Sequence, residues 1–89
     1  MDRQLDASLI AEVERLGTND IHDAKAAICM YVNYSRWLTK PPKRGYSSDD
    51  INRGFDKWER ILRSFVAHRK SGDLRSVDDI KKELFGDKV

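Results

Sequence analysis

The chain has 89 residues, of which 36% are charged and 39% are hydrophobic, and its formal net charge is +2. This length fits one domain, and the composition excludes a disordered chain, which would be less apolar, and a membrane protein, which would be less charged. Because acidic side chains interrupt the first twenty residues and no apolar run approaches the ~18 residues of a spanning helix, we expect a cytoplasmic protein without a signal peptide.

The first expected helix begins at residue 6 or 7 and ends at Leu16. Its apolar residues are spaced by four, four and three positions, which places them on one face of a helix. These residues are Leu5, Leu9, Val13 and Leu16. Gly17 follows directly, and we interpret it as the left-handed residue that ends the helix.

The second expected helix runs from about residue 20 to Leu38. It ends there because Pro41 and Pro42 lack an amide donor and disfavour helical geometry in the residue before them. It carries two apolar stripes, whereas a helix on the surface of a domain needs only one. One stripe is Ile21, Ala24, Ile28, Tyr31 or Val32, and Ser35, and the second is Ala27, Met30, Tyr34 and Trp37. We expect the second stripe to need cover from outside the domain.

The third expected helix starts at Ser47 or Ser48 and extends to about Lys70, with a pattern close to a capping box at its start. Its apolar residues alternate in spacing between four and three, like those of a coiled coil. They are Ile51, Phe55, Trp58, Leu62 and Phe65. Gly54 interrupts the helix at a cost of about 1 kcal/mol, for which a close contact with another helix is the expected reason. Gly72 ends this helix.

A short fourth helix is expected after Ser76, with Val77, Ile80 and Leu84 facing inward and Gly86 at its end. No strand pattern is found. The sequence therefore predicts an all-α fold, a small bundle of three main helices plus a short C-terminal helix, in a single domain of residues 1–89.

Positive charge is concentrated in the middle of the chain. Residues 1–23 carry six acidic and two basic side chains, whereas residues 24–48 carry five basic and no acidic ones. Segment 34–46 combines four cations with three aromatic residues, and together with Met30 it forms the expected partner-binding set. The set is Met30, Tyr34, Arg36, Trp37, Lys40, Lys43, Arg44 and Tyr46. Trp, Tyr and Arg dominate the energetic centres of protein interfaces.

Two other interpretations of this segment remain open. In one, the loop is only solvated and its aromatic residues complete the core. In the other, its cations neutralise phosphates and its rings stack on unpaired bases. The nucleic-acid-binding set would be Arg36, Lys40, Lys43, Arg44, Arg60 and Arg63. A further basic face of the third helix, with Arg53, Lys57 and Arg60, is interleaved with Asp56 and Glu59, which favours a solvated surface.

Residue types that carry catalysis or bind metals form no recognisable group. Cys29, His22 and His68 lack the spacings typical of zinc ligands or of a nucleophile with its base. The paired aspartates at 49–50 and 78–79 stand in the first turns of expected helices, where the helix dipole accounts for them. We therefore expect no enzyme, metal, cofactor or small-molecule substrate, and we interpret Cys29 as a small, partly buried side chain.

Residues 22–27 read His-Asp-Ala-Lys-Ala-Ala and resemble the His-x-x-Lys-[Gly/Ala] core of histidine phosphotransfer domains. The resemblance implies a helical bundle in which His22 accepts a phosphoryl group and Lys25 steadies the added charge. It covers six residues, and His22 falls in the first turn of its helix rather than in the middle. A helix-turn-helix at residues 16–18 is disfavoured, because its reading helix would emerge from the acidic part of the chain.

The interpretation that we adopt is a non-catalytic protein-interaction module, such as an adaptor, an inhibitor or a self-associating accessory protein. Its expected partner is another protein or a second copy of the chain. Nucleic-acid binding is the alternative.

Overall fold

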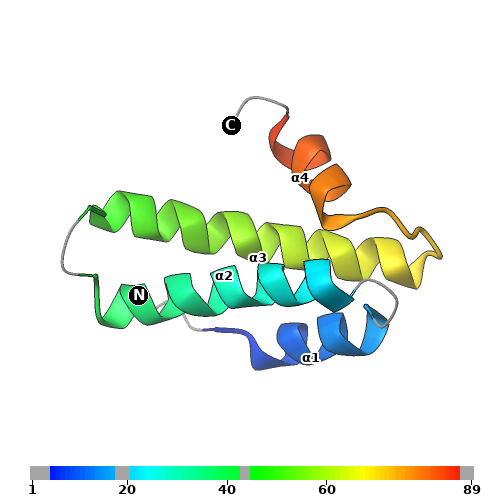
Figure 1. Ribbon diagram of the computed structural model, residues 1–89, viewed down its shortest axis with the longest axis horizontal. Coiled ribbons are helices and arrows are strands. Elements are labelled where there is room, and N and C mark those ends of the chain that lie inside the picture. The colour runs from blue at the N-terminus through cyan, green and yellow to red at the C-terminus, as the bar shows by residue number, and fades with distance from the viewer. Residues whose placement is uncertain (1–4, 18–20, 43–44, 87–89) are drawn as a thin grey trace.

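The computed structural model describes residues 5–17, 21–42 and 45–86, apart from the side chains of residues 21–23 (Figure 1). The described residues form the helices α1 (Ala7–Leu16), α2 (Ile21–Thr39), α3 (Ser48–Lys70) and α4 (Val77–Phe85), and they contain no strand. This confirms the predicted all-α bundle of three main helices and a short C-terminal one.

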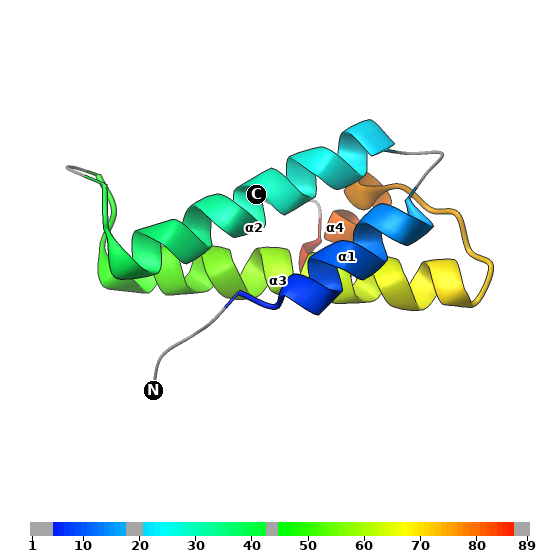
Figure 2. The same cartoon turned by 90° about the horizontal axis from the view of Figure 1, so that it is seen from below.

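The helices α2 and α3 form an antiparallel hairpin, and α1 and α4 lie on its two opposite sides (Figures 1 and 2). Because α3 packs against each of the other helices, it supplies about half of the core. The buried apolar residues are Leu9 and Val13 of α1, Ala24, Ala27 and Tyr31 of α2, Ile51, Phe55, Ile61, Leu62, Phe65 and Val66 of α3, and Val77 and Ile80 of α4.

Side-chain caps fix the starts of three helices. Asp6 accepts a hydrogen bond from the Leu9 amide at 3.2 Å at the start of α1. Ser47 and Asp50 form the predicted capping box, in which each side chain accepts from the other residue's amide. Ser76 accepts from the Asp79 amide at 3.1 Å and begins α4. Each bond satisfies an amide that the first turn of a helix leaves without a partner.

Gly17 ends α1 as predicted, but the predicted reason, a left-handed backbone conformation, is wrong. Its φ is −95°, so the residue is not left-handed, and it is buried. A Cβ at this position would lie 2.9 Å from the Val13 carbonyl oxygen, 3.1 Å from Phe65 Cζ and 3.2 Å from Ala24 Cβ. Position 17 requires glycine because three helices meet there and leave no room for a side chain.

Candidate protein-interaction surface

Three aromatic rings form a continuous ladder at the end of the α2–α3 hairpin. The Tyr34 and Trp37 ring centroids lie 5.1 Å apart, with the planes close to perpendicular. The Trp37 and Tyr46 centroids also lie 5.1 Å apart, and these rings stack at 26°. Both geometries are favourable for aromatic pairs. The ladder thus places Tyr46, which directly precedes the Ser47 cap of α3, against the last turn of α2. We call the described residues Tyr34, Arg36, Trp37, Lys40 and Tyr46 the hairpin-tip surface; Met30, the other described member of the predicted partner-binding set, lies one helical turn before Tyr34, in the middle of α2.

The ladder is anchored in the fold at one end and open at the other. Tyr34 packs against the core and lies directly on the backbone of α3 at Gly54, the close helix contact that the sequence predicts. Trp37 is half-buried, and Tyr46 is 49% exposed. The rings therefore complete the packing of the domain in part and still leave apolar surface exposed.

The second apolar stripe of α2 is more fully covered than we expected. Ala27 is completely buried inside the domain, and Met30, Tyr34 and Trp37 are half-buried. Because α3 and α4 both pack against α2, two elements far along the chain supply this cover. Of the large apolar side chains exposed among the described residues, Tyr46 lies at the hairpin end, whereas Leu74 and Phe85 lie near α4.

Two cations of segment 34–46 belong to the described residues. Arg36 and Lys40 are exposed, and the ion pairs of the described residues include neither of them. Lys43 and Arg44 lie outside the described residues. The hairpin-tip surface therefore combines part-exposed rings with positive charge that is available to an acidic group on a partner.

The other two members of the predicted nucleic-acid set lie elsewhere. Arg63 forms ion pairs with Asp6 at 3.4 Å and with Glu59 at 3.8 Å, and it is already engaged with carboxylates. The guanidinium of Arg60 lies 5.3 Å from the ring centre of Phe85, on the side of α3 that faces α4. The structure therefore separates the described members of this set: Arg36 and Lys40 at the hairpin tip, Arg63 at the α1–α3 seam and Arg60 on the α3–α4 side.

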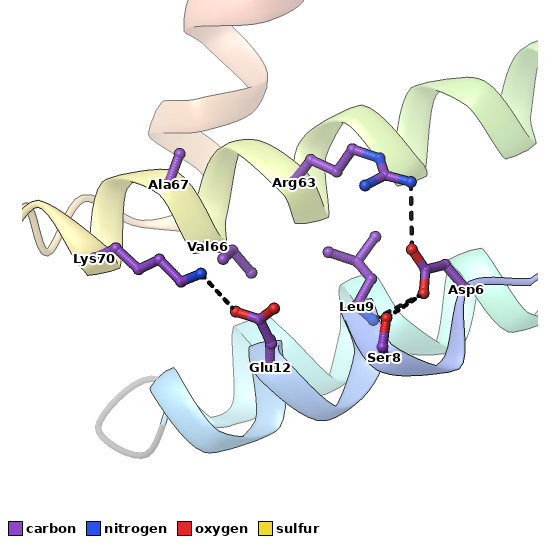
Figure 3. Close-up of a pocket in the computed structure, with 8 residues that line it drawn as sticks. All are labelled: Asp6, Ser8, Leu9, Glu12, Arg63, Val66, Ala67 and Lys70. Atoms are coloured by element: carbon purple, nitrogen blue, oxygen red, sulfur yellow. Dashed lines mark hydrogen bonds and ion pairs between the residues drawn. The ribbon is translucent and has the colours of Figure 1, made fainter.

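The groove between α1 and α3 has an ion pair between the two helices' sides at each of its ends (Figure 3). Asp6 and Arg63 face each other at one end, and Glu12 and Lys70 approach to 3.0 Å at the other. Its volume is about 350 Å³, and its remaining lining residues are Ser8, Leu9, Val66 and Ala67. Since each cation already faces a carboxylate, this groove is a seam that holds α1 in place.

A buried hydroxyl ties the same seam to the core. Tyr31 accepts a hydrogen bond from the Asp6 amide at 3.0 Å and donates one to Glu59 at 2.8 Å. Burial, together with the nearby carboxylate of Glu59, raises the pKa of Tyr31 to about 12. The pKa of Asp6 lies below its usual value. Its carboxylate accepts hydrogen bonds from the Ser8 hydroxyl and the Leu9 amide, and the positive charge of Arg63 lies nearby. The sequence pattern identified Tyr31 as apolar only, because periodicity carries no information on a hydroxyl's partners.

The residues considered for chemistry are dispersed. His68 lies between Asp73 and Glu83, at 3.5 and 3.6 Å, where it joins the end of α3 to α4. Cys29 is exposed, which corrects the expectation that it is partly buried. The side chain of His22 lies outside the described residues. Within the described part of the chain, no three His, Cys, Asp or Glu residues are grouped as metal ligands.

None of the helices in the described ranges combines the length and the hydropathy that crossing a bilayer requires. No protein-family model, curated protein or solved structure matches this chain.

Proposed function

We propose that the chain is a non-catalytic protein-interaction module that docks a partner protein through the hairpin-tip surface. The observation that supports this most strongly is the aromatic ladder of Tyr34, Trp37 and Tyr46. It is ordered by ring contacts within the domain, and its outer ring is 49% exposed. A surface that is already ordered loses little side-chain entropy on binding, which favours affinity.

The charges next to the ladder support the same proposal. Arg36 is exposed in the last turn of α2 and Lys40 is exposed directly after it, so a partner's carboxylates can meet them at the rim of the interface. An aromatic centre with a charged rim is the usual anatomy of a protein interface, in which Trp, Tyr and Arg contribute most of the binding energy.

Nucleic-acid binding receives less support. Stacking on bases requires an accessible ring face, and the Trp37 ring already contacts Tyr34 and Tyr46. Arg63 is engaged with Asp6 and Glu59 and lies apart from the hairpin tip. Nucleic-acid binding is therefore kept as an outcome of the test.

The test compares tagged wild-type protein with two variants in affinity capture from a lysate of the source cells, with and without nuclease. The variant Arg36→Glu with Tyr46→Ala alters exposed positions of the hairpin-tip surface. Lys25→Glu makes the same charge change at an exposed position of α2 outside it. We expect one protein, identified by mass spectrometry, to survive nuclease treatment and to fall about tenfold in the double variant only.

Two results would contradict the proposal. One is equal capture by wild type and double variant. The other is capture that disappears after nuclease treatment and is replaced by direct, steeply salt-dependent binding to an oligonucleotide, which would establish the alternative. Light scattering at several protein concentrations identifies the remaining case, in which the partner is a second copy of the chain.

A further inference from the structure

A second surface lies between α3 and the end of α4. It is a groove of about 330 Å³, lined by Arg53, Asp56, Lys57, Arg60 and Phe85. Three cations and one acid thus surround one aromatic ring. Phe85 is 36% exposed at the last residue of α4, so the groove has an apolar floor that solvent reaches. It shares no residue with the hairpin-tip surface.

Two of the three groove cations, Lys57 and Arg60, lie over aromatic rings. The Lys57 ammonium lies 5.8 Å from the ring centres of both Phe85 and Trp58. The Arg60 guanidinium lies 5.3 Å from the ring of Phe85, and the Lys81 ammonium lies 5.4 Å from the ring of Trp58. Cations within about 6 Å of a ring centre are attracted to its face. Residues from α3 and α4 thus form one positively charged surface with aromatic rings beneath its cations.

The spacing of the cations suits carboxylates on a polypeptide. Positions 53, 57 and 60 are separated by four and three residues, so they follow one face of α3 with a rise of about 6 Å and 4.5 Å between them. Alternate side chains of an extended peptide repeat at about 6.6 Å, and successive turns of a helix repeat at about 5.4 Å. Either form of acidic segment can place neighbouring carboxylates opposite these cations.

From this charge complementarity we infer that the α3–α4 groove binds an acidic segment of a partner polypeptide. A large apolar side chain of the segment packs on Phe85, and its carboxylates pair with Arg53, Lys57 and Arg60. A nucleic-acid strand fits less well, because binding of a single strand relies on several rings on which successive bases stack, and the described residues that line this groove include one ring only, that of Phe85.

Fluorescence anisotropy at low salt tests this inference with labelled probes. The main probe is a short peptide of Asp and Glu with one central Phe. Two matched peptides carry Ala in place of that Phe, or Asn and Gln in place of the acids, and a labelled single-stranded oligothymidylate is the fourth probe. We expect the main probe to bind, its affinity to fall as salt is raised, and each altered peptide to bind about tenfold more weakly.

Variants of the protein locate the binding. Arg53→Gln with Arg60→Gln removes two exposed charges while it keeps a polar, uncharged side chain at each position, and Phe85→Ala removes the ring of the groove floor. Each variant should weaken binding of the main probe about tenfold. Phe85→Leu should keep most of the affinity, which separates loss of the floor from misfolding. Arg15→Gln removes an exposed cation from α1, on the opposite side of the hairpin, and should bind as wild type does.

Each remaining outcome decides against the inference. It is overturned if the main probe does not bind at low salt, or if the arginine double variant binds it as tightly as wild type. It is also overturned if oligothymidylate binds more tightly than the peptide and is lost in the same variant, since the groove would then belong to a nucleic acid. Tyr46→Ala should not affect the peptide, so a failure here is distinguishable from a failure of the proposed function.

Discussion

The backbone of Gly54 lies against the ring of Tyr34, so closely that a Cβ at position 54 would be 2.6 Å from Cδ1 of the ring and closer still to Cε1 and Cζ. This contact joins the C-terminal part of α2 to the first half of α3. It also links the fold to the proposed docking surface, because Tyr34 is the inner ring of the ladder that continues through Trp37 to Tyr46. The position of the outer rings therefore depends on a glycine one helix away.

Gly54→Ala is expected to destabilise the domain, although alanine favours helices by about 1 kcal/mol over glycine. The added methyl group overlaps the Tyr34 ring, and forcing an extra group into a packed interface costs about 1–3 kcal/mol. Urea unfolding followed by circular dichroism measures the change. In a Tyr34→Ala background the ring is absent, so the same substitution should stabilise the domain. A stabilising effect in the wild-type background would contradict this role for Gly54.

Alanine and asparagine should rank in opposite orders of stability at Gly17 and at Gly72. Gly72 has a φ of +87° with open space around it, so asparagine, which tolerates left-handed geometry, should be accepted better than alanine. Gly17 has an ordinary φ but is enclosed by Val13, Ala24 and Phe65, so alanine should be accepted better than the larger asparagine. Thermal unfolding of the four single variants measures both orders. The same order at both positions would contradict the distinction between backbone strain and crowding.

The helix ends were predictable because local chemistry determines them. Ser47 and Ser76 satisfy amides within their own first turns, and Pro41 stops α2 two residues after its last helical position, so no distant contact is needed. The burial of the second apolar stripe of α2 by other helices could not be predicted from local chemistry. Ala27 is buried by helices that follow it, and their crossing geometry is set by tertiary packing.

The site residues were predictable only in part, for the same reason. The composition of segment 34–46 indicates a charged and aromatic surface, but not the order in which its rings stack. The spacing of Arg53, Lys57 and Arg60 indicates a basic face of α3. It does not indicate that Phe85, more than twenty residues later, lies beneath that face, since this depends on how α4 crosses α3.

Tyr31→Phe should lower stability and change its dependence on alkaline pH. The substitution removes the acceptor of the Asp6 amide and the donor to Glu59, and the loss should be about 1–2 kcal/mol at neutral pH. Folding raises the pKa of Tyr31 from 10.0 to about 12, so the folded state holds the proton of this hydroxyl more tightly than the unfolded state does, and protonation of Tyr31 stabilises the fold. This contribution is fully present below pH 10 and is lost as pH rises through about 12.

Urea unfolding at a series of pH values from neutral to alkaline measures this effect. Wild type should lose stability across the window between pH 10 and about 12, and Tyr31→Phe should lose less over the same window. Parallel curves for the two proteins would show that the Tyr31 hydroxyl is not held neutral by its surroundings.

Arg75→Gln should loosen α4 and raise the pKa of Asp73. Arg75 donates to Asp73 from both its side chain and its amide, and it also pairs with Glu83 of α4. These hydrogen bonds hold the pKa of Asp73 below its usual 3.8, with smaller help from the charges of Arg75 and His68. A lowered carboxyl pKa means that the stabilisation is present above pH 3.8 and is lost as pH falls through the folded-state value.

Nuclear magnetic resonance can follow both consequences of Arg75→Gln, through titration of the Asp73 carboxyl carbon and hydrogen exchange of the α4 amides. In the variant the Asp73 midpoint should move up towards 3.8, and α4 should exchange faster at neutral pH. Acidification of wild type should speed exchange in α4 before it does so in α2, because Asp73 and Glu83 tie α4 to the end of α3 through His68 and Arg75. Arg15→Gln on α1 is the matched control. If the variant left the Asp73 midpoint unchanged and α4 as protected as before, the position of Phe85 over α3 would have to rest on the apolar contacts of Val77, Ile80 and Leu84.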